Sequence, residues 1–345
     1  MVLIMVMAAL ALVAVVASRF AQRIDALRAQ TSSLRAHADQ RLQTEAALAA
    51  GLYLLSTERL EAAGVGNKLN PRLNPTLELT LNPTLNPTLE PTLTSTPKPM
   101  LWLDDRRYAL PGGGLLQAQD LRGLLPLNAP ERATLQRLLA QAGVSAALAD
   151  QMVDVLADYT DTDSLKRLNG AERNDYQALD LPPPRNDWLL AVRELHRMPV
   201  WKDQPAAVAL MLRLASQARR PVLNPNTAPL ALLAAVFPGA SGEQLALFVA
   251  QRENLPFRDA RAAQLATGLP FIEDEHIFSC GADVRITASA KGSRHAAQYN
   301  VQLTPAGRDA PWLISHIQPV PRSDPPDAPD RAEPFPLALF QPRRP

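Results

Sequence analysis

The chain has 345 residues, a formal net charge of +1, 47% hydrophobic residues and one cysteine. This composition is typical of a folded protein, and the length allows an anchor with one or two folded units. A near-neutral charge disfavours nucleic acid as a partner, because such binding needs a basic excess. A single cysteine, Cys280, excludes an intramolecular disulfide and a thiolate zinc cluster, and we expect it to be a buried structural thiol.

Residues 1–50 predict one long N-terminal transmembrane and stem helix, because neither proline nor glycine occurs before Gly51. Met1 to Ser18 carries no charge and is just long enough for a single-pass anchor, since about 20 apolar residues cross a bilayer core. Beyond it an apolar row at helical spacing predicts a stem that packs against other helices. The row consists of Phe20, Ile24, Leu27, Leu34, Ala38 and Leu42. A cleaved signal peptide is the alternative, although no basic start precedes the apolar run.

Residues 51–100 are predicted to form a Pro-rich linker. Its Leu-Asn-Pro-Thr units place leucines four residues apart between Leu81 and Leu93. Proline at this density removes amide donors and excludes helix and sheet, so we expect an extended spacer. A ligand for a proline-recognising domain is the alternative.

The rest of the chain predicts strands, then helices, then strands. Residues 101–123 contain two strand-like runs around a Pro-Gly turn, 124–279 show helical periodicity, and 280–318 return to a strand pattern. The predicted helical runs include Trp188 to Leu195, Val208 to Leu214 and Leu230 to Val236, and the later strands are Ala282 to Ala288, Gln298 to Leu303 and Pro311 to Ile317. We therefore predict an α+β fold, an antiparallel sheet with a large inserted α-helical domain, followed by a flexible tail at 319–345.

The densest acidic cluster lies in a loop between two predicted helices. Its members are Asp158, Asp161, Asp163, Glu172 and Asp175. Crowded oxygen ligands on irregular backbone suit calcium. The spacing does not make an EF-hand, because Lys166 stands where the sharp turn needs glycine. The alternative is a solvated loop whose aspartates cap the neighbouring helices.

Residues 224–265 resemble one helix-hairpin-helix unit of competence-type DNA receptors, with Asn226-Thr227-Ala228 at the start and Arg252 and Pro256-Phe257 later. Such units bind phosphate through a Gly-hydrophobic-Gly hairpin, but Gly239 is followed here by Ala-Ser-Gly, and the charges nearly cancel. DNA binding is therefore disfavoured. The chain contains no Gly-x-Ser-x-Gly, His-Glu-x-x-His, phosphate-loop or dinucleotide motif, so we predict no enzymatic activity.

Over nearly its whole length the chain resembles the K-type minor pseudopilins of the type II secretion system, the general secretion pathway protein K family. Met5 adds to the resemblance, because most pseudopilins carry Glu at that position and the K type lacks it. The other markers are Met1-Val2-Leu3-Ile4, Asp120…Gly123…Leu127-Asn128, Asp161-x-Asp163 with Gly170-Ala171-Glu172 and Tyr176, and Asn224-x-Asn226-Thr227-Ala228.

The resemblance implies a non-enzymatic protein with a long N-terminal helix on a pilin-like sheet. It implies a cap on the pseudopilus tip, shared with the I and J minor pseudopilins, that initiates assembly and supports export across the outer membrane. Further implied partners are other pseudopilins, the inner-membrane secretion platform and, where a leader precedes Met1, prepilin peptidase. The implied location is the inner membrane, single-pass, with the globular part in the periplasm.

The resemblance also implies calcium in the acidic loop. Asp161, Asp163 and Glu172 are the candidate ligands, with Asp158 and Asp175 as further donors. Two other functions stay open at this point: a membrane-tethered helix-hairpin-helix DNA-uptake receptor, and an anchored periplasmic module without a role in a filament.

Overall fold

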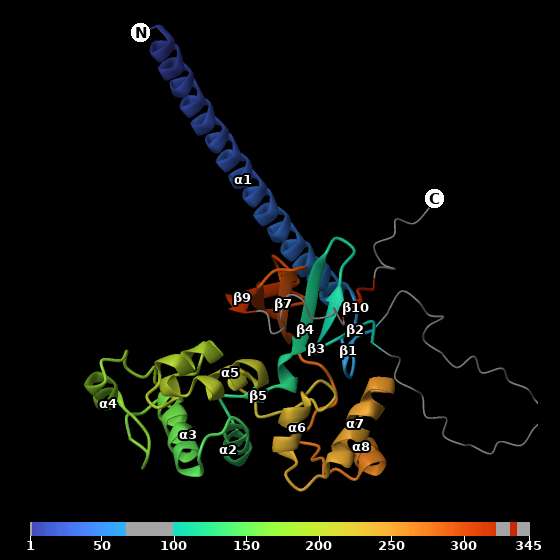
Figure 1. Cartoon of the computed structure of the whole chain (residues 1–345). Helices are drawn as coiled ribbons and strands as arrows, with labels where there is room; N and C mark the ends of the chain where they lie inside the picture. Colours follow the sequence, from blue (N-terminus) through green and yellow to red (C-terminus); the bar gives the residue numbers. More distant parts are fainter. Residues whose placement is uncertain (1, 67–98, 322–331, 337–345) are drawn as a thin grey trace, which may run out of the picture.

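The computed structural model describes residues 2–66, 99–321 and 332–336. Figure 1 shows a long helix, α1, that projects from one side of a sheet, while the shorter helices gather on the other side. This arrangement confirms the prediction of a mixed α+β fold with a long N-terminal helix and a sheet. The Leu-Asn-Pro-Thr units and most of the predicted tail lie outside the described residues.

Helix α1 spans Val2–Thr57 and so continues beyond the predicted boundary at residue 50. Its last turns pack on the sheet, where Ala47, Leu54 and Leu55 are buried. Gly51 permits this contact, because a Cβ there would lie 3.1 Å from a methyl carbon of Leu116. The part before these turns extends away from the body (Figure 1). Among the described residues, no helix combines the length and hydrophobicity needed to cross a bilayer.

Within the described residues, the main sheet has six strands in the order β10-β3-β4-β7-β8-β9. Neighbouring strands are antiparallel except β10, which runs parallel to β3. The strands are β3 (Asp104–Ala109), β4 (Gly114–Asp120), β7 (Asp283–Ala290), β8 (His295–Leu303), β9 (Trp312–Pro321) and β10 (Glu333–Pro334). The predicted hairpin and the three later strands are therefore present.

Two predicted irregular segments contribute strands instead. The linker prediction was wrong at its start, because β1 (Gly64–Val65) pairs with β2 (Leu101–Trp102). The tail prediction was wrong where β9 continues to Pro321 and where β10 adds an edge strand beside β3. Short parallel strands β5 (Leu125–Pro126) and β6 (Ala215–Ser216) form a second small sheet. Backbone pairing with distant strands, which no local pattern encodes, orders these segments.

The two faces of the main sheet differ in polarity, because successive residues of a strand point to opposite faces. On β7, Val284, Ile286 and Ala288 belong to the apolar core that also contains the end of α1. The alternate residues Arg285, Thr287 and Ser289 line a cavity together with residues of the helical part, which is the segment between β4 and β7. One face is thus apolar and covered by α1, and the other is polar and faces the shorter helices.

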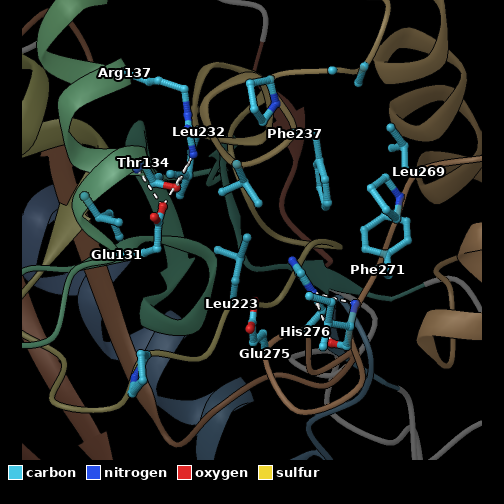
Figure 2. Close-up of a pocket in the computed structure, with 18 of the residues that line it drawn as sticks. Glu131, Thr134, Arg137, Leu223, Leu232, Phe237, Leu269, Phe271, Glu275 and His276 are labelled. Carbon is cyan, nitrogen blue, oxygen red and sulfur yellow. Dashed lines mark hydrogen bonds and ion pairs between the residues drawn. The ribbon is translucent and has the colours of Figure 1, made fainter.

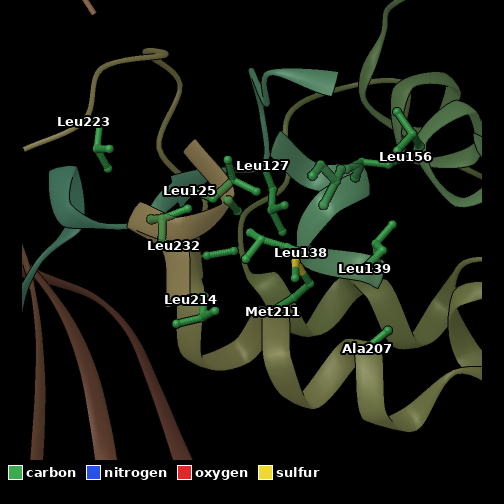
Figure 3. Close-up of a cluster of buried hydrophobic side chains, with 14 of the residues drawn as sticks. Leu125, Leu127, Leu138, Leu139, Leu156, Ala207, Met211, Leu214, Leu223 and Leu232 are labelled. Atoms are coloured by element: carbon green, nitrogen blue, oxygen red, sulfur yellow. The ribbon is translucent and has the colours of Figure 1, made fainter. Parts of the chain in front are cut away.

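The chain leaves the sheet after Asp120 and returns to it at Asp283. The helices in between are α2 (Arg132–Gln141), α3 (Ala146–Thr160), α4 (Arg173–Ala178), α5 (Pro205–Leu214), α6 (Leu230–Val236), α7 (Gly242–Asn254) and α8 (Ala260–Thr267), with 3₁₀ turns η1 (Leu121–Gly123), η2 (Val192–Arg197) and η3 (Trp201–Asp203). They enclose a second apolar core, part of which Figure 3 shows. Leu138, Leu139, Leu156 and Met211 meet there, which positions α2, α3 and α5.

The predicted helices at Val208 to Leu214 and Leu230 to Val236 are present as α5 and α6. The prediction of a helix over Trp188 to Leu195 is wrong, because only the 3₁₀ turn η2 forms there. Trp188 is 43% exposed, and the central carbon of the Arg219 guanidinium lies 3.8 Å from the centroid of its ring. The apolar residues at this spacing follow a loop rather than one face of a helix.

Candidate functional site

The acidic loop connects the end of α3 to the start of α4. Asp158 lies on the last turn of α3, and its side chain is fully buried. The loop passes this carboxylate at Gly170, where a Cβ would come within 1.8 Å of Asp158 Oδ2. Gly170 is therefore required for the close approach of the loop backbone to Asp158.

Arg167 neutralises part of this acidic loop. Its guanidinium donates to Asp158 Oδ1 at 2.7 Å and to Asp161, and its backbone amide donates to Asp158 Oδ2 at 3.2 Å. The Asp161 and Asp158 carboxylates raise the pKa of Arg167. The loop thus already contains a cation that joins two of the five predicted ligands.

Glu172 has no such partner. Its residue is 8% exposed, and neither carboxylate oxygen finds a hydrogen-bond donor among the described residues. Burial and the negative charges of Asp158, Asp161 and Asp163 raise its pKa, and the Arg173 backbone amide opposes this shift. Oδ1 of Asp161 is buried and unpaired in the same described set. These unsatisfied oxygens are suitable ligands for a hard cation.

Asp163 and Asp175 are more peripheral in this loop. Asp163 accepts the Leu165 amide at 2.8 Å. Asp175 accepts Lys166 Nζ at 2.7 Å and the Glu172 amide at 2.9 Å, and the Lys166 bond lowers its pKa. Asp175 therefore caps α4, as the capping alternative expects. As the side chains stand, the described residues contain no group of three or more His, Cys, Asp or Glu arranged to hold a metal.

A second polar cluster, which the sequence did not reveal as a unit, surrounds the fully buried Asp120. Its Oδ2 accepts Asn224 Nδ2 at 3.0 Å and the Thr227 hydroxyl at 3.2 Å, and its Oδ1 accepts the Gly281 amide at 3.1 Å. Asn224 Nδ2 also donates to the Ala62 carbonyl at 3.0 Å. Burial raises the pKa of Asp120, and these bonds oppose the shift. The cluster joins the chain after α1, the end of β4, the segment before α6 and the approach to β7.

The segment that resembles a helix-hairpin-helix unit uses its arginine internally. Arg252, on α7, is 7% exposed and donates to the Pro225 and Ala228 carbonyls at 2.5 and 2.7 Å. Burial lowers the pKa of Arg252 to about 10. Arg252 therefore fixes α7 to the segment before α6 and does not face a ligand. Cys280 is buried, as predicted, and burial raises the pKa of its thiol.

A cavity of about 810 Å³ lies between α2, α6 and the segment after α8 (Figure 2). Leu223, Leu232, Phe237 and Phe271 contribute apolar walls. The polar side chains at its edge bond to one another or to backbone: Arg137 donates to Thr134 and Glu131, and His276 Nδ1 accepts the Ile272 amide. The cavity is thus largely apolar, and these polar groups form hydrogen bonds to other residues of its lining.

Comparison with known proteins gives two family matches. Models described as "Type II secretion system (T2SS), protein K" match residues 115–212 and 223–275. The first match contains the acidic loop, and the second contains the Asn224 motif and the whole helix-hairpin-helix-like segment. No curated protein matches the chain.

Among solved structures, the chain is similar to one chain of the GspK-GspI-GspJ complex from the type 2 secretion system of enterotoxigenic Escherichia coli. The identity is 17% and the TM-score is 0.45. The similarity covers 63% of this chain and 84% of the matched chain.

Proposed function

We propose that this chain, which belongs to the protein K family of the type II secretion system, is the minor pseudopilin that caps the pseudopilus tip. The observation that carries the proposal is the pair of family matches. They include both the acidic loop and the Asn224 motif, on which the sequence resemblance also rests. The prediction of membership in this family is thereby confirmed.

The exposed stem of α1 supports a role in assembly. Phe20, Leu27, Leu34 and Leu42 lie along one side of the helix, and each is at least 56% exposed. Burial of such a row against sister helices is favourable by about 25 cal/mol per Å² of apolar area. In this proposal residues 1–18 hold the chain in the inner membrane, and the stem packs with those of the I and J pseudopilins in the periplasm.

The helical part supports the position at the tip. It leaves the sheet between two adjacent strands, β4 and β7, and lies on the side of the sheet opposite to α1 (Figure 1). In a filament whose subunits pack through α1, this bulk would stand above the pilin-like sheet and block a further subunit. The secretion platform and the other pseudopilins would then contact the chain on the side of α1, opposite to the helical part.

Calcium in the acidic loop is part of the same proposal. The buried, unpaired Glu172 carboxylate and the unpaired Asp161 oxygen support it. Asp158, Asp161, Asp163 and Glu172 would be the ligands, and the ion would supply positive charge that holds the loop against α3. Arg167 would have to release Asp158 and Asp161 first.

Co-purification of the full chain with the I and J pseudopilins tests the proposed function. We expect a ternary complex that Leu27→Asp combined with Leu34→Asp abolishes, because both residues are exposed on the stem. Arg35→Asp is the matched control, since it changes an exposed neighbour outside the apolar row. A normal complex and normal secretion with the double stem variant would contradict the assembly role.

A further inference from the structure

A second cavity, of about 290 Å³, lies between the polar face of the main sheet and the helical part. Four arginines line it, Arg107 from β3, Arg193 from η2, Arg213 from α5 and Arg285 from β7. Among the described residues, Asp105 is the only acidic one in this lining. The described lining therefore has a positive excess in a chain that is nearly neutral overall.

Arg285 forms the floor of this cavity. It is 6% exposed, and its two terminal nitrogens donate to the Leu212 and Arg213 carbonyls, at 3.1 and 3.0 Å. These carbonyls belong to the last turn of α5, so the guanidinium caps that helix end. Its third nitrogen, Nε, is buried and has no hydrogen-bond partner among the described residues. A buried guanidinium of this kind needs a further acceptor.

Asp105 does not balance the cavity charge. Its backbone has a φ of 67°, in the left-handed region, which places it on an irregular part of β3. Burial raises the pKa of Asp105, and the positive charges of Arg285, Arg107 and Arg213 oppose the shift. Even when ionised, Asp105 supplies one negative charge against the positive charges of Arg193, Arg213 and Arg285.

Both the shape and the remaining lining suit a small polar ligand. Arg193 is held at the rim by a bond from its guanidinium to the Pro319 carbonyl at 2.6 Å, and Arg213 is exposed. Thr287, Gln117 and Gln298 add neutral hydrogen-bonding groups on the sheet side. The volume corresponds to roughly ten water molecules at about 30 Å³ each, which is enough for a small anion with part of its hydration shell.

We propose that this cavity binds a small oxyanion with two or more negative charges, of the phosphate or dicarboxylate class. Guanidinium groups bind such planar or tetrahedral oxyanions through paired charge-assisted bonds. Arg285 supplies the buried contact, and Arg193 and Arg213 supply the outer contacts. The site is independent of the acidic loop and of the proposed role in the pseudopilus.

Calorimetric titration of the full chain with inorganic phosphate, and separately with succinate, tests this site in a low-salt chloride buffer. We expect one site per chain, with affinity about 2- to 5-fold weaker in Arg193→Gln and in Arg213→Gln, and about 10-fold weaker in the double variant. Arg220→Gln, an exposed arginine outside the cavity, should bind as the unmodified chain does. The stronger of the two ligands identifies the anion class.

The rim variants keep the test independent of folding. Arg285→Gln removes the cap of α5 and can destabilise the chain, whereas Arg193 and Arg213 are exposed. Absence of binding of both anions by the unmodified chain would overturn the proposal. Equal affinity of the double variant and the unmodified chain would also overturn it, because the anion would then bind elsewhere.

Discussion

Replacing Arg167 should strengthen calcium binding by the acidic loop. Calcium and the Arg167 guanidinium compete for the same oxygens, since Arg167 donates to Asp158 Oδ1 at 2.7 Å and to Asp161. A hydrogen bond to a charged group contributes about 1.5–3 kcal/mol. Because the Arg167 side chain is 42% exposed, solvent screening lowers the contribution of its ion pair with Asp158 to about 1 kcal/mol. Loss of that competition corresponds to about fivefold in affinity.

The assay is a calcium titration of the full chain at fixed ionic strength, by calorimetry or by competition with a chelating dye. Arg167→Gln should bind calcium about fivefold more tightly than the unmodified chain. Arg173→Gln is the matched control, because it removes the same charge from an exposed residue of the same segment. Equal gains in both variants would refute the competition, since general electrostatics would then explain the effect. Weaker binding in Arg167→Gln would mean that Arg167 holds the loop in its binding conformation.

Three further outcomes follow from the described contacts. Burial and neighbouring charges raise the pKa of Glu172 above its ordinary value of 4.5. Without calcium, the free energy of unfolding should therefore fall as the pH rises from below 4.5 through the raised pKa, because the carboxylate then ionises in the folded chain. Glu172→Gln should remove this pH dependence in thermal unfolding, and an unchanged dependence would contradict it. Asp120→Ala should lower the free energy of unfolding by about 1–3 kcal/mol or more in chemical denaturation, because it leaves buried donors unpaired. A loss below about 0.5 kcal/mol would contradict this prediction. Gly170→Ala should destabilise the chain because its Cβ would meet Asp158, whereas Gly112→Ala, with no described atom within 4 Å of its Cβ, should be tolerated; equal effects would contradict this.

The β3-β4 hairpin and helix α6 were predictable because their signal is local. The Pro-Gly turn and the alternating residues around it define the β3-β4 hairpin, and the apolar spacing at Leu230 to Val236 defines α6. The segment at Trp188 to Leu195 shows the limit of such patterns. Its apolar residues are also closely spaced, but packing leaves Trp188 and Leu190 about half exposed and the chain forms only a 3₁₀ turn.

The site was predictable in composition but not in pairing. The sequence places five acidic residues in one loop, but it does not show that Arg167 joins Asp158 and Asp161 or that Glu172 is left unpaired. The Asp120 cluster was out of reach for a related reason. Its members Asp120, Asn224 and Gly281 are far apart in the sequence, and only the folded chain brings them together.

The Asp120 cluster fixes the base of the helical part to the sheet that carries α1. Asp120 lies where the chain leaves the sheet, and the Gly281 amide that it binds lies just before the chain returns. The helical part is thus bonded at its base to the sheet that carries α1, while α4, which follows the acidic loop, lies at the edge of the helical part away from the sheet (Figure 1). If the I and J pseudopilins pack through the stem, Arg167→Gln should leave their affinity unchanged while it strengthens calcium binding. If their affinity changes with calcium, they must contact the helical part directly, because the base of that part is fixed by the bonds of Asp120.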